Sequence, residues 1–230
     1  MRTALITGIA RTGGIAEGIA PRLRADGWRV VTSDLDSGDV PCDLATVEGP
    51  PALMREVGSV HGPISALILS HAHDVESGIL DTTAESFDRH VAVNARASLL
   101  LVAAFARQVP ASGGAVVALT SDHTTGNLPY GASKGALDRI VISAARELGP
   151  LGISANVLNP GPIDTGWMDD DTRGADGRAA SGQARHPRRH RRGRRVPRLR
   201  GRPVGVGTAA ARRRRVLGAL LMPRRVTPRR

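Results

Sequence analysis

The first 34 residues carry the pattern that most restricts the fold of this 230-residue chain. Residues 3–7 form a short apolar run that leads into a glycine-rich segment at 8–18, and a second apolar run follows at 29–33. This order predicts two parallel strands joined by a helix that begins at about Ile15. Glycines at such a strand-to-helix turn let the backbone approach a phosphate, which the helix N-terminus stabilises.

The turn and the residue after the second run predict a dinucleotide site. Asp34 stands 20 residues after Gly14, where a carboxylate accepts hydrogen bonds from the adenosine ribose, and this favours NAD over NADP. NADP remains the alternative, since Arg11 could reach a 2′-phosphate. We expect the cofactor to contact Gly8, Arg11, Gly14, Ile15 and Asp34.

Further apolar runs alternate with helical stretches as far as Pro160. They occupy residues 64–69, 115–119 and 153–158, and a short strand is expected just before Asp43. Regular alternation predicts an α/β fold, a Rossmann-like doubly wound parallel sheet in a single domain over residues 1–170.

The only tyrosine and the only lysine of the chain, Tyr130 and Lys134, stand four positions apart. On a helix this spacing puts both side chains on one face, where the ammonium would favour the phenolate. Arginine does not supply the same compact charge, which explains a lone lysine in an arginine-rich chain. The pair therefore predicts a proton-transfer site. Ser121 follows one predicted strand, and Asn94 lies in a helical stretch expected over residues 86–108.

With Asn94, Ser121, Tyr130 and Lys134 in this order, the sequence resembles the short-chain dehydrogenase/reductase family. The resemblance implies that the serine binds the substrate oxygen and the tyrosine exchanges its proton. It further implies that the lysine lowers the tyrosine pKa and holds the ribose, and that the asparagine supports a proton relay. The loop before Tyr130 is shorter than is usual in the family, so Thr120 is the alternative to Ser121.

The resemblance adds further cofactor contacts. They are Asp43, Leu44, Ser70, Ala72, Pro160, Gly161, Ile163 and Thr165. Where the family has Asn-Asn-Ala-Gly, residues 70–73 read Ser-His-Ala-His. His71, His73 and Asp74 have a spacing that metal ligands use, but no further ligand cluster accompanies them, and we expect no metal.

Two details bear on the reaction. Thr12 replaces the usual middle glycine, and Ala16 makes the turn similar to that of enoyl reductases. The Tyr130 to Lys134 interval instead favours a carbonyl reductase or alcohol dehydrogenase with a small-molecule carbonyl or alcohol substrate. Reduction of 3-oxoacyl-carrier-protein is the narrower alternative.

Composition suggests where the protein works. Cys42 is the only cysteine, so no intrachain disulfide can form, and no leader or membrane-spanning run is apparent. We therefore expect a cytoplasmic protein that does not bind membranes. The helices around Asn94 and Lys134 are strongly apolar, and the resemblance implies that they form the interface of a homo-oligomer.

The net charge of +11 comes entirely from the C-terminal segment: residues 1–170 have a balance of −7 and residues 171–230 one of +18. This irregular tail, rich in Arg and Pro, has a composition that cannot bury a core. A nucleic-acid-binding arm is one interpretation, but the tail lacks aromatic residues for base stacking, and we do not expect nucleic acid as a partner.

A coding interpretation of the tail is the alternative. When it is back-translated and read one base later, residues 203–215 can encode a stretch similar to the family's closing strand. Residues 186–197 can encode one similar to its last helix. We infer a frameshift near residues 171–182, and the tail is then out of frame. A nucleotide-binding product without turnover is a further alternative, because such a chain lacks the family's last strand.

Overall fold

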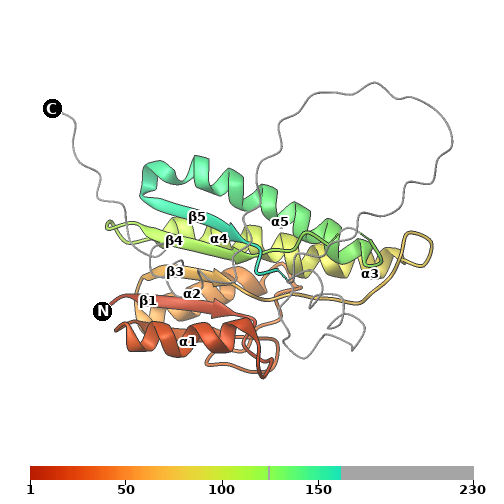
Figure 1. Ribbon diagram of the computed structural model, residues 1–230. Coiled ribbons are helices and arrows are strands. Elements are labelled where there is room, and N and C mark those ends of the chain that lie inside the picture. Colours follow the sequence, from red (N-terminus) through yellow and green to blue (C-terminus); the bar gives the residue numbers. More distant parts are fainter. Residues whose placement is uncertain (124, 162–230) are drawn as a thin grey trace, which may run out of the picture.

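The computed structural model describes residues 1–123 and 125–161. Within them five parallel strands form one sheet in the order β2-β1-β3-β4-β5 (Figure 1). The strands are β1 (Thr3–Thr7), β2 (Arg29–Ser33), β3 (Ile64–Leu69), β4 (Gly114–Leu119) and β5 (Ile153–Leu158). Each coincides with a predicted apolar run, to within one residue.

Helices connect the strands. They are α1 (Ile15–Ala25), α2 (Gly49–His61), α3 (Ala84–His90), α4 (Ala97–Gln108) and α5 (Leu128–Glu147), with a short 3₁₀ turn at Gly149–Leu151. Between α3 and α4 lies a π-helical turn, Val91–Arg96, so the helix expected over residues 86–108 is interrupted. The turn includes Asn94, and π-helical turns occur often at functional sites.

The two faces of the sheet are covered by different helices. Leu5 of β1 belongs to the core that α2, α4 and α5 form, together with Leu53, Leu101 and Leu137. Its neighbour Ile6 points to the opposite face and packs in a second core with Ile19 of α1 and others. Alternate residues of one strand thus serve two cores, because side chains alternate across a strand. The predicted α/β, Rossmann-like doubly wound sheet is confirmed.

The short strand expected before Asp43 is absent from the described sheet. The segment lies beside β2, where Val40 N–H donates to the Thr32 carbonyl at 3.1 Å. The return hydrogen bond is missing, because Thr32 N–H donates to the Asp39 carboxylate at 2.9 Å. A side chain therefore takes the place of a backbone acceptor, and no regular ladder forms.

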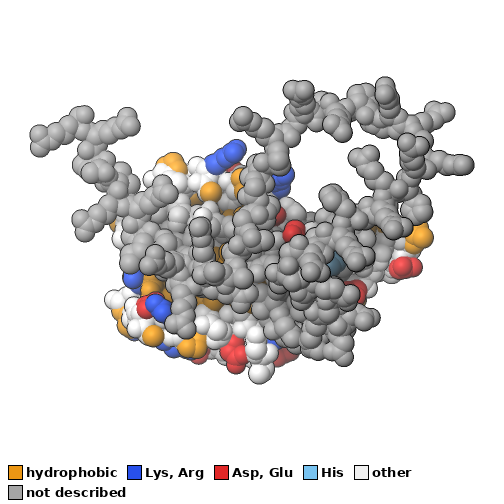
Figure 2. Space-filling view, in the orientation of Figure 1, with side chains coloured by type: hydrophobic (Ala, Val, Ile, Leu, Met, Phe, Trp, Pro, Cys, Tyr) orange, Lys and Arg blue, Asp and Glu red, His pale blue; other side chains and the backbone are white. Residues whose placement is uncertain are grey.

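Figure 2 shows acidic and basic side chains together on the visible described surface. In the described part, no helix combines the length and the apolar character needed to cross a membrane. The predicted domain end at residue 170, the contacts of Ile163 and Thr165, and the tail at 171–230 all lie outside the described residues.

Candidate active site

A pocket of about 670 Å³ opens at the carboxyl ends of the strands, a volume that suits a small organic ligand. Gly8, Asp34, Ser70 and Thr120 each directly follow a strand and line it. The predicted site residues on its wall are Gly8, Arg11, Gly14, Ile15, Asp34, Asp43, Leu44, Ser70, Ala72, Tyr130, Lys134, Pro160 and Gly161. Asn94 and Ser121 are not on the wall.

The glycine-rich turn approaches the end of β3 closely. Gly8 has a φ of +82°, and a Cβ there would lie 2.5 Å from the backbone nitrogen of His71. At Gly14, a Cβ would lie 2.8 Å from the Arg11 carbonyl oxygen. Side chains at these two positions would force the turn open, so both glycines are required by the path of the backbone.

Two carboxylates hold this turn. Ala10 N–H donates to Asp34 at 2.9 Å, and Gly13 N–H donates to Glu17 at 2.5 Å. Asp34 therefore lies at the pocket, as expected, and also fixes the turn. Glu17 occupies a backbone donor at the N-terminus of α1, so an anionic ligand there would compete with it.

Asn94 lies at the junction of three segments and is 1% exposed. Its Oδ1 accepts from His73 N–H at 2.7 Å, and its Nδ2 donates to the His73 carbonyl at 2.9 Å. Nδ2 also donates to Ser133 Oγ at 2.8 Å. Its amide thus fastens the loop after β3 to α5, the helix that carries Tyr130 and Lys134.

Tyr130 and Lys134 lie in the N-terminal part of α5, and both reach the pocket. Lys134 is 2% exposed, and its Nζ donates to the Leu119 carbonyl at 3.0 Å. The same Nζ lies 5.6 Å from the centre of the Tyr130 ring. The predicted pair is brought together at the wall, although the ammonium bonds a strand carbonyl.

Burial has the largest effect on the pKa values of the pair. Burial, and then the charge of Asp74, raises the pKa of Tyr130 to about 12. Burial lowers the pKa of Lys134 to about 8, against the opposing effect of Asp74 and Asp138. The pKa of Tyr130 is therefore raised in this structure, because desolvation disfavours the phenolate, and the expected lowering by Lys134 stays a prediction.

Thr120, the alternative to Ser121, lines the same pocket as Tyr130. Its Oγ1 is buried and has no hydrogen-bond partner among the described residues. Ser121 Oγ accepts from His123 N–H at 3.2 Å and does not line the pocket. Thr120 therefore lies on the pocket wall and Ser121 does not, and the choice between the two hydroxyl groups stays a prediction.

The loop after β3 differs most from the family motif. His71 is buried, with Thr7 Oγ1 at 2.7 Å from Nδ1 and the Val93 carbonyl at 3.1 Å from Nε2. Burial, and then the charge of Lys134, lowers its pKa to about 3. Neutral His71 thus ties β1 to the π-helical turn. Residues 1–123 and 125–161 contain no group of three His, Cys, Asp or Glu side chains able to hold a metal ion.

The charge of Asp74 affects several groups of the pocket. Asp74 accepts from Asn127 Nδ2 at 2.5 Å. Its charge raises the pKa of Tyr130, and it opposes the lowering of the Arg11 pKa that burial causes. Sequence reasoning considered Asp74 only as a metal ligand. Its position shortly after a predicted strand end was the sequence signal that could have placed Asp74 at the pocket.

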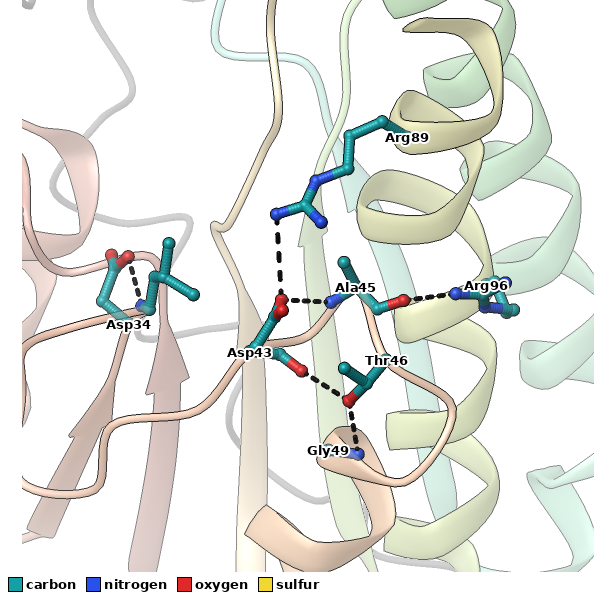
Figure 3. A network of polar contacts seen from close by, with 8 residues as sticks. Asp34, Asp43, Ala45, Thr46, Gly49, Arg89 and Arg96 are labelled. Atoms are coloured by element: carbon teal, nitrogen blue, oxygen red, sulfur yellow. Dashed lines mark hydrogen bonds and ion pairs between the residues drawn. The ribbon is translucent and has the colours of Figure 1, made fainter. Parts of the chain in front are cut away.

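The far end of the pocket is a loop that two arginines contact, shown in Figure 3. Asp43 accepts from Ala45 N–H at 2.8 Å and forms an ion pair with Arg89 at 3.9 Å. Arg96 donates to the Ala45 carbonyl. Arg89 lines the pocket and was missed, because one arginine in an amphipathic helix carries no sequence signal.

Comparisons with known proteins agree with this geometry. Residues 8–195 match a family model described as enoyl-(acyl carrier protein) reductase. An uncharacterized oxidoreductase, YjdA, of Bacillus subtilis (strain 168) is 32% identical over 198 residues, covering 75% of this chain and 79% of the relative. Human L-xylulose reductase is 36% identical, covering 73% of this chain and 76% of its own.

Solved structures give the same result. A short-chain dehydrogenase from Burkholderia cenocepacia J2315, in complex with NADP, superposes with a TM-score of 0.70 at 28% identity. The match covers 78% of this chain and 81% of that one. Strand order, pocket and relatives lead to one conclusion: this chain belongs to the short-chain dehydrogenase/reductase family of oxidoreductases.

Proposed function

We propose that this protein is an NAD-dependent oxidoreductase that transfers hydride between nicotinamide and a carbonyl or secondary alcohol. The observation that carries the proposal is the buried Lys134 beside Tyr130, in a pocket that begins at the glycine-rich turn. The bound nicotinamide would supply the hydride. Tyr130 would exchange the proton with the substrate oxygen.

The residues present fit a dinucleotide. Gly8 and Gly14 line the pocket beside the N-terminus of α1, where a pyrophosphate would bind, and Asp34 lies where the adenosine ribose would bind. A carboxylate at this point repels a 2′-phosphate and so supports NAD. NADP is the alternative, supported by the bound NADP of the Burkholderia relative and by Arg11 in the pocket.

The reduction direction suits the protonation states. With a pKa of about 12, the Tyr130 phenol keeps its proton near neutral pH and can donate it to a carbonyl oxygen. Lys134 stays mostly charged below its pKa of about 8 and would stabilise the phenolate formed. Thr120 would orient the substrate oxygen, and its place in the pocket lining supports this role.

The substrate class is a small polar ketone. The pocket wall includes His73, Asp74 and Glu76, polar side chains that favour hydroxyl groups over a long acyl chain. The relative that is an L-xylulose reductase supports testing polyhydroxy ketones first. The narrower alternative, 3-oxoacyl-carrier-protein reduction, draws support from the description of the matching family model.

A homo-oligomer, either a dimer or a tetramer, is part of the proposal. Leu99 of α4 is 50% exposed and Ile142 of α5 is 39% exposed, on the helices expected to form the interface. Apolar side chains exposed on two neighbouring helices favour association with a second copy. The family relationship supports a cytoplasmic location.

Cofactor titration followed by turnover tests the proposal. NADH and NADPH should each be titrated by fluorescence into the purified full chain, and ketones and secondary alcohols then assayed. We expect tighter binding of NADH and reduction of hydroxyketones. A gene corrected by one base near codons 171–182 provides the comparison for the proposed frameshift and should be more active. A corrected protein that binds either dinucleotide but turns over no substrate would favour a nucleotide-binding role without catalysis.

A further inference from the structure

Arg89 and Asp43 form an ion pair in the wall of the pocket. Figure 3 shows the Arg89 side chain extending toward Asp43, and lower in the view Arg96 reaching the Ala45 carbonyl from the neighbouring helix. The two charged groups lie 3.9 Å apart, and their side chains are 46% and 41% exposed. A half-exposed ion pair at this distance contributes little to the free energy of unfolding, so stabilising the fold does not explain why Arg89 is placed here.

Arg89 belongs to the pocket. It lines the wall together with Asp43 and His73, and its charge contributes to lowering the pKa of His73. The guanidinium therefore lies near residues of both the β3 loop and the Asp43 loop. A ligand that fills the pocket beyond Asp34 would meet this planar group.

The loop that faces Arg89 is held rigidly. Asp43 Oδ1 accepts from Ala45 N–H at 2.8 Å, and Thr46 Oγ1 links the Asp43 carbonyl to Gly49 N–H through bonds of 3.0 Å each. Among the described residues no donor bonds Asp43 Oδ2. One carboxylate oxygen is thus fixed and the other can accept a hydrogen bond from a ligand.

We infer that Arg89 stacks on the adenine base of the dinucleotide and encloses it against the loop at residues 43–45. The inference rests on the proposed function, because it assumes a dinucleotide with its ribose at Asp34. A guanidinium stacks well on an aromatic face, and Asp43 Oδ2 can accept the adenine amino group. Arg96 keeps the loop in place through the Ala45 carbonyl.

The Asp43 carboxylate determines whether Arg89 contacts the adenine base or a 2′-phosphate. A 2′-phosphate close enough to bond Arg89 would also approach Asp43, and the two negative groups would repel each other. A neutral base with an amino group meets no such repulsion. The arrangement of Arg89 beside Asp43 therefore selects adenine over the 2′-phosphate as the group it contacts.

The test separates the two halves of the cofactor by binding alone. Dissociation constants of NADH, NADPH, ADP-ribose and reduced nicotinamide mononucleotide should be measured for wild type, Arg89→Ala and Arg89→Lys. In Arg89→Ala we expect weakening on the order of tenfold for the three ligands that contain adenine. Binding of the mononucleotide should not change. Arg89→Lys keeps the positive charge but lacks the planar guanidinium. It should therefore recover less than half of the affinity that Arg89→Ala loses.

Arg55→Ala is the matched control, since Arg55 is an exposed arginine on α2 and lies outside the pocket. Four outcomes would overturn the inference: unchanged NADH affinity in Arg89→Ala, equal weakening of the mononucleotide, full recovery by Arg89→Lys, or a loss confined to NADPH. Absence of all dinucleotide binding in wild type would instead reject the proposed function, and with it the basis of the inference.

Discussion

Asn94 Nδ2 donates a hydrogen bond to Ser133 Oγ at 2.8 Å, in the residue before Lys134. Ser133 Oγ in turn donates to the Tyr130 carbonyl at 2.7 Å. The π-helical turn that carries Asn94 is thereby joined to the stretch of α5 that carries Tyr130 and Lys134, the proposed proton-transfer pair. Because Asn94 and Ser133 are buried, no water replaces these bonds at low cost.

Asn94→Ala should therefore affect both stability and catalysis. It leaves buried donors and acceptors of His73 and Ser133 without partners, at a cost of about 1–3 kcal/mol in the free energy of unfolding. Urea denaturation measures this loss, and turnover should fall with it. Ser133→Ala removes only the connection to α5, so it should lower turnover with a smaller loss of stability. Equal effects of both variants on stability would contradict this division of roles.

Burial of Lys134 predicts an unusual dependence of stability on pH. Its pKa in the folded protein is about 8, below the ordinary value of 10.5, so folding disfavours the charged form. Its contribution to stability is therefore fully present above pH 10.5 and is lost as pH falls through 8. Between pH 8 and pH 10.5 the melting temperature of wild type should rise more steeply with pH than that of Lys134→Met. Parallel curves for the two proteins would show that Lys134 is not desolvated.

Glu17 should limit cofactor affinity, because its carboxylate occupies the Gly13 N–H at the N-terminus of α1. Glu17→Gln removes the negative charge beside the expected pyrophosphate position, and we expect NADH to bind a few-fold more tightly. Titration by fluorescence measures the change. Asp26→Asn, at the other end of the same helix, is the control and should leave the affinity unchanged. A weaker affinity in Glu17→Gln would indicate that Glu17 instead shapes the turn for its ligand.

Two substitutions distinguish the hydroxyl groups near the substrate. Thr120→Val keeps the shape of the side chain and removes the unpartnered hydroxyl, so kcat should fall about 10²-fold or more while NADH affinity stays the same. Ser121→Ala should have a much smaller effect. The reverse order of effects would restore Ser121 as the group that binds the substrate oxygen.

How far the sequence predicts this protein depends on whether a feature is local. The strands were found because continuous apolar runs are typical of buried parallel strands, as residues 64–69 illustrate. The prediction of a strand before Asp43 was wrong. The Asp39 carboxylate accepts the hydrogen bond of Thr32 N–H that a strand would use, and the sequence pattern does not show this contact. The pKa directions of Tyr130 and Lys134 depend on burial, which spacing alone does not give. Arg89 required the fold itself to show that it meets Asp43.

The most direct test of the account is reduction of a hydroxyketone by Tyr130→Phe, measured with NADH binding in the same preparation. The ring is kept and only the proton is removed, so we predict that turnover falls at least about 10³-fold while the dissociation constant of NADH changes by less than about twofold. Turnover in Tyr130→Phe equal to that of wild type would contradict the central claim that Tyr130 exchanges the proton with the substrate.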